Sequence, residues 1–349
     1  MEPVVIALAS DNRYFPGLYC AVASALVHLN PARKLDVKVL DGGLSQRSRD
    51  ILWRLTERIG GDVELAFVTA DASVFSAATL GPGRSNMPYY RILLSQLVNV
   101  PRLIYLDCDT LIFRDLSELF DLELSHGNIL AAVRDSETLS LAEDSLVLAK
   151  AMNLPAKGAY FNSGVMLMNL DELRRQRFFE SAVNFLNCWS GKYQFWDQSA
   201  INFLLHKQIE DLPEHWNRAS WHFDAQQNND LDCVLHYTRS APWLRRRPCP
   251  AQALFEQFAA EAGLRGNRPS PGFQRLWQNA MAPLRALAFP VAALCCRLLG
   301  KNDQSAAYRK VAGYWLDHIR KAPHRRRLYS ERRQEISRMK FGIPASLVS

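Results

Sequence analysis

The chain contains one stretch, residues 103–106, that is apolar at every position and is followed at once by two carboxylates, Asp107 and Asp109. An uninterrupted apolar run is typical of a central strand in a parallel sheet that is covered on both faces. Open α/β sheets bind their ligands beyond the carboxyl ends of such strands. Carboxylates one residue apart on an extended chain project to the same side, where both can face one divalent cation. A solvated Asp-x-Asp turn is the alternative, which the strand before it disfavours.

Other segments repeat an alternation of strand and helix along the chain. Residues 4–9, 35–40 and 63–68 have strand character, and apolar-periodic helices are expected over 18–29 and 45–59. This alternation indicates an α/β fold with a parallel, doubly wound sheet between helices. Later in the chain, strands are expected at 129–133, 160–170 and 233–238, and a long helix at 171–189.

The formal charge is concentrated at the C-terminal end. The net charge of the 349 residues is +7, but residues 301–349 hold 12 Lys or Arg and 4 Asp or Glu, while residues 1–300 hold 30 and 31. The basic character therefore belongs to the tail alone. A chain of this length suits one large domain with an appendage, or two domains. We predict an α/β domain over 1–250 and a basic, amphipathic, mainly helical region over 251–349.

The cysteines and the N-terminus bear on the cellular setting. The seven cysteines are scattered and include no Cys-x-x-Cys pair, which favours reduced thiols in the cytosol over a zinc ribbon or a disulfide framework. The N-terminus has no basic region before its short apolar run, so we interpret it as the first strand and not as a signal peptide. No stretch reaches the roughly 18–20 uninterrupted apolar residues of a membrane-spanning helix.

Five short motifs occur in order along the chain. They are Ala9-Ser10-Asp11-Asn12 with Tyr14, Asp107-Cys108-Asp109, Tyr160-Phe161-Asn162-Ser163-Gly164-Val165, Asp197-Gln198, and His236-Tyr237-Thr238 with Pro242-Trp243. In this order they resemble the family 8 glycosyltransferases, a retaining group that includes bacterial lipopolysaccharide galactosyl- and glucosyltransferases and glycogenin. The resemblance implies a GT-A (nucleotide-diphospho-sugar transferase) fold, which is a Rossmann-like mixed sheet flanked by helices. It also implies UDP-sugar-dependent hexosyl transfer.

The resemblance implies a divalent metal site made by Asp107, Asp109 and His236. A cation that bridges both phosphates of a nucleotide-sugar stabilises the negative charge that builds up on the leaving diphosphate. The nitrogen ligand favours Mn²⁺ over Mg²⁺. A lone histidine is otherwise more often a satisfied core residue, but the position of His236 at the end of a short strand favours the metal role.

The loop after the first strand resembles the uridine-binding loop of the family, with nucleotide contacts from Ala9, Ser10, Asp11 and Asn12. Asp11 is expected to accept a hydrogen bond from the uracil N–H while Tyr14 stacks on the ring. Capping of the following helix by Asp11 or Asn12 is the alternative and is compatible with this role. The remaining expected donor contacts are Arg91, Asp107, Cys108, Asn162, Ser163 and Arg239.

The resemblance also assigns the catalytic residues. Asp135, Asn162 and Asp197 are expected to bind the sugar hydroxyls, because a polyol needs polar partners. Gln198 is expected beneath the anomeric carbon. An amide is a poor nucleophile, so Gln198 fits front-face substitution with an oxocarbenium-like transition state better than a covalent glycosyl-enzyme. Structural hydrogen bonding is the alternative for Asn162 and Gln198, and an ordinary surface ion pair is the alternative for Arg91.

The chain departs from the family pattern at its lid and diphosphate contacts. The residue after the catalytic glutamine is Ser199, where some relatives carry an acid, which disfavours double displacement. The usual Gly-x-x-Lys-Pro-Trp ending reads Thr-Arg-Ser-Ala-Pro-Trp at 238–243, so the glycine and the lysine are missing. Arg239 or the arginines 245–247 are the candidates to supply positive charge instead. The loop 80–86 is either a surface loop or a lid over the nucleotide.

Beyond residue 273 the chain alternates apolar, helix-like segments with arginine clusters and bulky aromatic residues. This composition suits helices that lie on an anionic membrane surface, and a solvated basic face and a nucleic-acid patch are the alternatives. We expect peripheral contact with the cytoplasmic face of the inner membrane, a glycolipid or lipopolysaccharide-core acceptor, and no nucleic-acid partner.

Together these features favour a metal-dependent retaining transferase that moves galactose or glucose from a UDP-sugar to a lipid-linked sugar hydroxyl. Two other classes of protein stay open. A sugar-nucleotide pyrophosphorylase would use the same sheet and carboxylate pair, but such enzymes usually carry a glycine-rich first loop, which residues 9–14 are not. A non-catalytic membrane adaptor would depend on the basic tail alone.

Overall fold

The computed structural model describes residues 2–60, 62–71, 73–75, 87–225, 231–244, 249–264 and 331–343. The chain divides into two compact units, the first made of residues 1–242, 258–265 and 341–349 and the second of 243–257 and 266–340. Three predicted features lie outside the described residues, namely the loop 80–86, the arginines 245–247 and the apolar and basic segments between 265 and 330. The predicted domain boundary at residue 250 stays a prediction.

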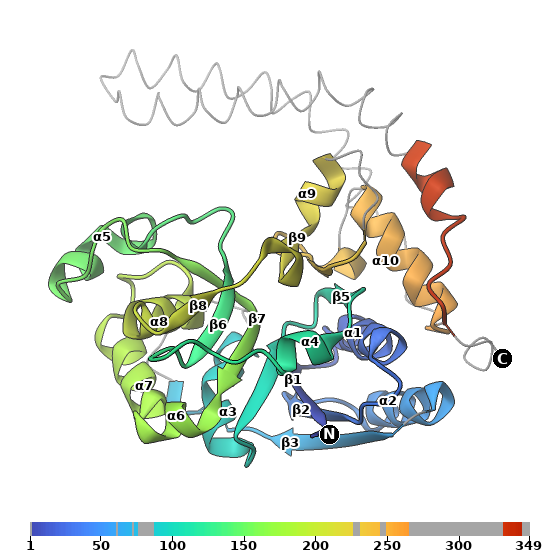
Figure 1. The fold of residues 1–349 in the computed structure, drawn as a ribbon, viewed down its shortest axis with the longest axis horizontal. Coiled ribbons are helices and arrows are strands. Elements are labelled where there is room, and N and C mark those ends of the chain that lie inside the picture. The colour runs from blue at the N-terminus through green and yellow to red at the C-terminus, as the bar shows by residue number, and fades with distance from the viewer. Residues whose placement is uncertain are drawn as a thin grey trace. The chain divides into compact units, whose positions relative to one another are not determined.

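A seven-stranded mixed sheet forms the centre of the first unit (Figure 1). Its strands are β1 (Val4–Ser10), β2 (Leu35–Asp41), β3 (Val63–Thr69), β4 (Arg102–Leu106), β6 (Leu130–Arg134), β7 (Phe161–Asn169) and β8 (Ile209–Asp211). They follow the order β3-β2-β1-β4-β7-β6-β8. All neighbours pair in parallel except β7, which runs antiparallel to both β4 and β6. The predicted α/β fold with a mixed sheet is therefore confirmed.

Strand β4 lies in the middle of this sheet, between β1 and β7. Its residues 103–106 are at most 1% exposed, which confirms the prediction of a strand covered on both faces. The reversal of β7 departs from the parallel sheet that strand–helix alternation alone predicts. The cause is the excursion between β6 and β7, which closes on itself: the N–H of Asp135 donates to the carbonyl of Tyr160, and Ser140 forms a bridge with Ala159. The chain thus re-enters the sheet at the end where β6 left it.

Helices flank the sheet (Figure 1). They are α1 (Phe15–His28), α2 (Gln46–Ile59), α3 (Tyr90–Leu97), α4 (Leu116–Phe120), α5 (Leu141–Ala151), α6 (Leu170–Arg175), α7 (Phe178–Cys188) and α8 (Trp196–Leu205). Two further helices follow later in the chain, α9 (Ser220–Ala225) and α10 (Pro250–Glu261), and residues 250–257 of α10 belong to the second unit. Helix α1 begins three residues earlier than predicted because Pro16 fits the first turn, where its missing N–H is not needed. The single helix expected at 171–189 was wrong, since Arg177 takes a left-handed φ of 53° and separates α6 from α7.

A second, three-stranded sheet carries part of the candidate site. Its strands are β5 (Thr110–Ile112), β10 (Val234–His236) and β9 (Arg218–Ala219), in the order β5-β10-β9. Strand β10 pairs antiparallel with β5, so that His236 lies opposite Thr110, and parallel with β9. Because β5 begins four residues after the end of β4, this small sheet brings the predicted His236 to the carboxyl end of β4.

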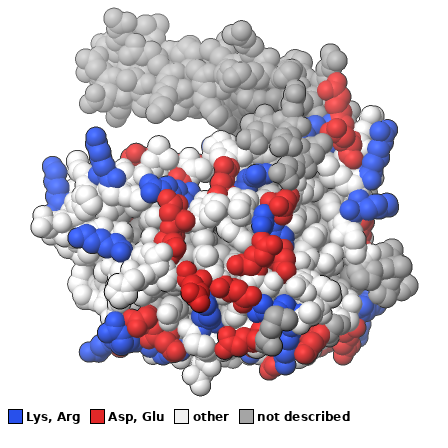
Figure 2. All heavy atoms as spheres, in the orientation of Figure 1, with Lys and Arg blue, Asp and Glu red and all other residues white. Residues whose placement is uncertain are grey.

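The described surface mixes the two signs of charge. On the face shown in Figure 2, acidic and basic side chains are interspersed. This agrees with the nearly equal numbers of acidic and basic residues before residue 300. In the part of the chain that the structure describes, no helix has both the length and the apolar character that crossing a membrane requires.

Candidate metal and sugar-donor site

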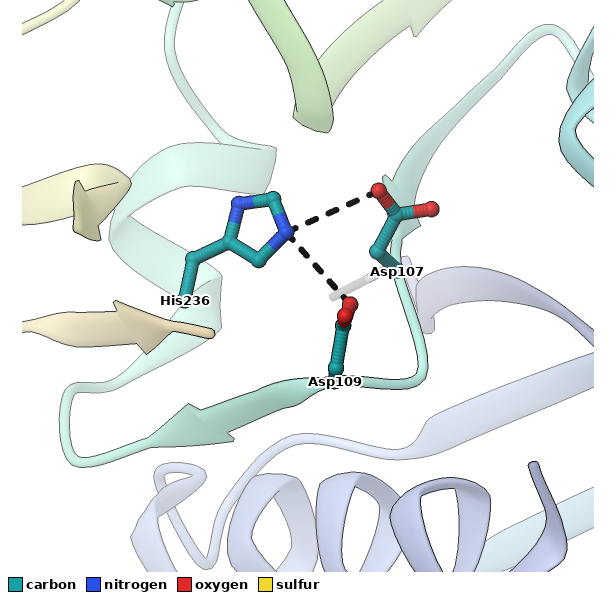
Figure 3. Close-up of side chains that lie close together, drawn as sticks. All are labelled: Asp107, Asp109 and His236. Carbon is teal, nitrogen blue, oxygen red and sulfur yellow. Dashed lines mark ion pairs between the residues drawn. The ribbon is translucent and has the colours of Figure 1, made fainter. Parts of the chain in front are cut away.

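The connection between β4 and β5 brings Asp107 and Asp109 together. The two aspartates flank a tight turn and do not lie on an extended strand, in contrast to the expectation from their spacing. Their carboxylates converge all the same, because both face the ring of His236 (Figure 3). The pairing of β10 with β5 fixes His236 at this point, and the N–H of Tyr237 donates to the carbonyl of Asp109 at 2.9 Å.

These three side chains form a set that fits a divalent cation. One ligand atom from each of them lies within 4.8 Å of the other two. The Nε2 of His236 is 3.4 Å from Oδ1 of Asp109 and 3.7 Å from Oδ2 of Asp107. The side chains of Asp107 and Asp109 are 23% and 19% exposed, so a cation can reach them, whereas that of His236 is 6% exposed. Two carboxylate oxygens and an imidazole nitrogen are ligands that Mn²⁺ accepts.

The ring of His236 has a fixed orientation. Its Nδ1 lies 2.9 Å from Oδ1 of Asn217, and an amide oxygen only accepts, so Nδ1 carries the proton and Nε2 faces the carboxylates. Burial, the largest influence, lowers the pKa of His236, but Asp109 and Asp107 together outweigh it and raise the pKa above its ordinary value. The surroundings of Nε2 therefore attract positive charge.

Gly164 of β7 makes room for this cluster. A Cβ at this position would overlap Cε1 of the His236 ring and would lie 2.7 Å from its Nδ1 and 2.9 Å from Oδ2 of Asp107. The carbonyl of Gly164 also accepts a hydrogen bond from the N–H of Asp107 at 2.7 Å. The backbone of β7 thus passes directly against two of the candidate ligands, and only glycine fits there.

Arg91, in the first turn of α3, links the candidate metal ligand Asp107 to Ser163 and Asp197. Its Nη1 donates to the carbonyl and hydroxyl oxygens of Ser163 at 2.5 and 2.8 Å, and its Nη2 donates to Oδ1 of Asp107 at 2.9 Å. Its Nε lies 2.8 Å from Oδ2 of Asp197. Arg91 is 6% exposed, so the surface ion pair considered as its alternative is wrong, and its pair with Asp197 is buried on both sides. Burial lowers the pKa of Arg91, but Asp107 and Asp197 outweigh it and raise the pKa.

Asp197, in the first turn of α8, is 3% exposed. Burial raises the pKa of its carboxyl group to about 7, although the nearby Arg91 works in the opposite direction. Among the described residues, its buried Oδ2 has no hydrogen-bond donor, since Arg91 is paired with it only by charge.

We expect Asp197 to make the protein less stable as the pH rises from about 4 to about 7. The folded state keeps this carboxyl protonated up to its pKa of about 7, whereas the unfolded chain ionises it near 3.8. The folded state binds more protons in this window, so the free energy of unfolding falls by up to about 1.4 kcal/mol per pH unit. Urea unfolding of wild type and Asp197→Asn should show a difference that changes between pH 4 and 7 and is constant above. A difference that is the same at every pH would contradict this.

Gln198 lies at the centre of a polar cluster. Its Oε1 accepts hydrogen bonds from the N–H and the hydroxyl of Ser163 at 3.0 and 3.2 Å. Its Nε2 donates to Oδ2 of Asp135 at 3.1 Å, and Nδ2 of Asn162 donates to the same oxygen at 3.0 Å. The structure thus brings four sequence-predicted residues within hydrogen-bond distance of one another. Their roles toward a sugar stay predictions.

The loop after β1 lies next to the metal cluster. The Sγ of Cys108 donates to the carbonyl of Ala9 at 3.1 Å, which ties this loop to the turn between the two aspartates. Oδ1 of Asp11 accepts from the N–H of Tyr14 at 3.0 Å, so Asp11 braces the entry to α1. The N-cap residue of α1 is Tyr14, not Asp11 or Asn12. Burial and then the charge of Asp109 raise the pKa of Tyr14.

Asn12 links two loops of the sheet edge. Its Nδ2 donates to the carbonyl of Gly43 at 3.0 Å, and its Oδ1 accepts from the N–H of Ser45 and the hydroxyl of Ser48, both at 2.9 Å. The hydroxyl of the buried Ser10 donates to the carbonyl next to it in the chain. The amide of Asn12 is therefore engaged within the protein, and its predicted contact with a nucleotide would replace one of these bonds.

A buried carboxylate that sequence reasoning missed supports the start of α8. Asp144 of α5 is 3% exposed and accepts hydrogen bonds from the N–H of Gln194 at 2.8 Å and the hydroxyl of Tyr160 at 2.9 Å. The hydroxyl of Ser199 lies 3.5 Å from that of Tyr160. These bonds hold the bend in which Trp196 takes a φ of 48°, a conformation that costs a bulky residue free energy. The bend directs the side chains of Asp197 and Gln198, which follow it, toward Arg91 and Ser163.

Arg239 follows β10 and is exposed. Its Nε donates to Oε1 of Glu137 at 2.8 Å, and its guanidinium lies 4.6 Å from the ring centre of Trp221. Glu137 comes two residues after Asp135, so Arg239 lies beside the loop that carries Asp135. Its predicted contact with the diphosphate stays a prediction.

Two further asparagines near the site, Asn202 and Asn217, were not predicted from the sequence. Asn202 pairs with the edge of β7: its Oδ1 accepts from the N–H of Phe161 at 2.7 Å, and its Nδ2 donates to the carbonyls of Phe161 and Gln198 at 2.8 and 2.9 Å. An asparagine within an apolar helix was the signal that could have identified it. Asn217, which contacts His236, stands in no periodic segment and gave no such signal.

Solved structures define the class of the fold. The galactosyltransferase LgtC, crystallised with donor and acceptor sugar analogs, matches with a TM-score of 0.62 at 24% identity, over 73% of this chain and 95% of that chain. The apo structure of the bifunctional glycosyltransferase WbbM matches with a TM-score of 0.61 at 21% identity, over 77% and 50%. The chain therefore has the GT-A fold, as predicted.

The sequence comparison gives the family. The model described as Glycosyl transferase family 8 matches residues 5–246, and the chain belongs to this family. General stress protein A of Bacillus subtilis (strain 168) is 30% identical over 181 residues, which cover 50% of this chain and 59% of that protein. Probable galacturonosyltransferase-like 9 of Arabidopsis thaliana is 23% identical over 278 residues, which cover 73% and 71%. Three bacterial relatives are matched over 59%, 31% and 51% of their own length, about half on average.

Proposed function

We propose that this chain is a metal-dependent retaining transferase that moves galactose or glucose from a UDP-sugar to a sugar hydroxyl of a glycolipid, as in a lipopolysaccharide core. One observation carries the proposal. Arg91 bonds both Asp107 of the metal cluster and Ser163, which in turn bonds Gln198 of the sugar cluster. A cation site and a polyol-binding cluster that share one arginine suit a substrate with a diphosphate at one end and a sugar at the other.

The residues of the chain divide the chemistry between them. A Mn²⁺ or Mg²⁺ ion bound by Asp107, Asp109 and His236 would supply positive charge to the leaving diphosphate. Gln198 is held by Ser163 and Asp135, so its amide is oriented before the substrate arrives. An oriented amide can stabilise a developing oxocarbenium ion by its dipole without forming a bond, which supports front-face substitution with retention.

The surroundings of Asp135 favour a donor sugar that carries no charge. The hydrogen-bond donors to its carboxylate are the side chains of Asn162 and Gln198 and the backbone N–H groups of residues 137 and 138. All four are neutral amides, so they bring no positive charge to offset the carboxylate. A uronic acid would place a like charge beside it, which is unfavourable. We therefore expect a neutral hexose, although some relatives are named galacturonosyltransferase-like.

The acceptor and the location follow from the composition of the tail. Residues 301–349 carry 12 Lys or Arg against 4 Asp or Glu. Basic segments of this kind are attracted to anionic lipid surfaces. We propose peripheral contact with the cytoplasmic face of the inner membrane, where a glycolipid acceptor would be presented.

We expect Asp109→Asn to lower the turnover of UDP-galactose or UDP-glucose with Mn²⁺ on the order of 100-fold, the effect of losing about 3 kcal/mol of transition-state stabilisation. The amide removes one charged ligand from the cation. The measurement is hydrolysis of UDP-galactose, UDP-glucose and UDP-galacturonate, with and without a glycolipid acceptor. Asp171→Asn, which affects only an exposed pair with Arg174, is the matched control.

Three outcomes would contradict the proposal. Unchanged turnover in Asp109→Asn would exclude the metal assignment. Release of pyrophosphate from UTP and a sugar phosphate would identify a pyrophosphorylase instead. Binding to anionic liposomes with no thermal stabilisation by UDP and Mn²⁺ would identify a membrane adaptor.

A further inference from the structure

A chain of side-chain hydrogen bonds joins the metal cluster to Gln198. Nδ1 of His236 donates to Oδ1 of Asn217 at 2.9 Å, and Nδ2 of Asn217 donates to Oδ1 of Asn162, also at 2.9 Å. Nδ2 of Asn162 donates to Oδ2 of Asp135 at 3.0 Å, and the same oxygen receives Nε2 of Gln198 at 3.1 Å. The five side chains come from separate parts of the chain and are linked without a gap.

We propose that Asn217 is a positioning residue that sets His236 for the metal and, through Asn162, sets Asp135 for Gln198. The inference rests on the proposed function and adds to it a residue that touches neither the cation nor the sugar. Asn217 would affect both the metal ligands and the cluster around Gln198, because its amide oxygen bonds His236 and its amide nitrogen bonds Asn162.

A backbone group fixes the direction of the whole chain of bonds. The N–H of Gly164 donates to Oδ1 of Asn162 at 2.9 Å, so this atom must be the amide oxygen. The atom of Asn217 that faces it must then be the NH₂ group, which leaves the oxygen of Asn217 facing His236. Nδ1 of His236 must therefore carry the proton and donate it to this oxygen, which leaves the lone pair of Nε2 free to bind a metal. One peptide N–H thus determines the tautomer of the candidate metal ligand.

The position of Asn217 is rigid. It is 7% exposed and lies between a short 3-10 helix (Glu214–Trp216) and β9. Strand β9 pairs in parallel with β10, where Ala219 lies opposite His236. The backbone that carries Asn217 and the backbone that carries His236 are therefore parts of one small sheet, and the hydrogen bond between them does not depend on a flexible loop.

Asn217 accepts one hydrogen bond and donates another, and only an amide side chain can do both. Two substitutions can therefore test the two bonds separately. Asn217→Leu removes both bonds, so His236 loses its orientation. Asn217→Asp keeps the shape and an acceptor for His236, but it places a carboxylate oxygen against Oδ1 of Asn162, where no hydrogen bond can form. The first variant tests the metal end of the chain of bonds, and the second isolates the sugar end.

The experiment measures Mn²⁺ binding alone by electron paramagnetic resonance and, separately, the steady-state hydrolysis of the UDP-hexose. Asn217→Leu is expected to weaken Mn²⁺ binding by about 10- to 100-fold, the usual effect of removing the partner of a metal-bound histidine. Asn217→Asp is expected to keep near-wild-type Mn²⁺ affinity and KM but to lower kcat by about 10-fold or more. Asn128→Leu, which removes a partly buried bond to Glu210 at another edge of the sheet, is the control for both measurements.

Wild-type Mn²⁺ affinity in a folded Asn217→Leu, or an unchanged kcat in Asn217→Asp, would overturn the proposal. If Asn217→Leu does not fold, as judged by its thermal transition, the isosteric Asn217→Asp decides through its kcat and its Mn²⁺ affinity. If the wild-type chain binds Mn²⁺ but hydrolyses no UDP-sugar, the proposed function fails, and the Mn²⁺ comparison still tests the role of Asn217 toward His236. If the wild-type chain binds no Mn²⁺, both proposals are wrong at the metal site.

Discussion

Gly164→Ala is expected to lower Mn²⁺-dependent turnover strongly by weakening the binding of the metal. The new methyl group would overlap the ring of His236 and lie 2.9 Å from Oδ2 of Asp107, so two of the three candidate ligands must move. His236 cannot easily give way, because Asn217 holds its Nδ1 and β10 holds its backbone. We expect Mn²⁺ affinity to fall by about 100-fold, at the upper end of effects seen when ligands lose their orientation. Mn²⁺ titration and UDP-hexose hydrolysis are the measurements.

Gly60→Ala is the matched control for this substitution. Gly60 ends α2 with a φ of 74°, and no atom lies within 4 Å of a Cβ built there. Alanine at this position loses roughly 1–3 kcal/mol of stability, because a φ of 74° with a ψ of −173° is a conformation that suits glycine almost alone, yet the variant should keep full activity. The two variants thus separate a loss of stability from a loss of the metal site. If Gly164→Ala bound Mn²⁺ as well as wild type does, the close approach of β7 to His236 would have no functional meaning.

The large elements of this fold could be predicted from the sequence because their patterns are long. Strand β4 is buried at positions 103–106, as an uninterrupted apolar run of this kind predicts. Asp107 and Asp109 could be placed at the end of that strand for the same reason. The strands β5, β8 and β9 could not, since they have only two or three residues and, unlike β10, no family motif marks them. The direction of β7 was also hidden, because it depends on backbone bonds between residues 135 and 160.

The candidate site divides in the same way. His236 was identified by its resemblance to a family motif, and the structure shows the cause of its position, which is the pairing of β10 with β5. The burial of Arg91 could not be read from its own helix, because its partners come from β7, α8 and the turn after β4. Asn217 could not be predicted for a similar reason. It bonds Asn162, whose amide is oriented by the N–H of Gly164, and both lie more than 50 residues away in the chain. Long-range polar contacts leave no periodic trace in a sequence.

Arg91→Met is expected to lower the free energy of unfolding by about 3–5 kcal/mol at pH 8, the usual cost of removing one partner from a buried ion pair. Methionine can fill part of the space, but Asp197 and Asp107 would each lose the positive charge that lies 2.8 and 2.9 Å away. Arg175→Met is the control, because its pair with Glu172 is exposed and such pairs contribute about 0–1 kcal/mol. Urea unfolding of both variants is the measurement.

The dependence of this loss on pH tests its cause. Burial already raises the pKa of Asp197 to about 7, and Arg91 is the main influence that lowers it. Without the arginine the pKa rises further, so the carboxyl takes up a proton as the pH falls to 6, and the penalty of an unpaired buried charge is removed. Arg91→Met should therefore be closer to wild type at pH 6 than at pH 8, and adding Asp197→Asn should restore part of the stability at pH 8. A loss that is equal at both pH values would show that Arg91 acts through packing and not through its charge.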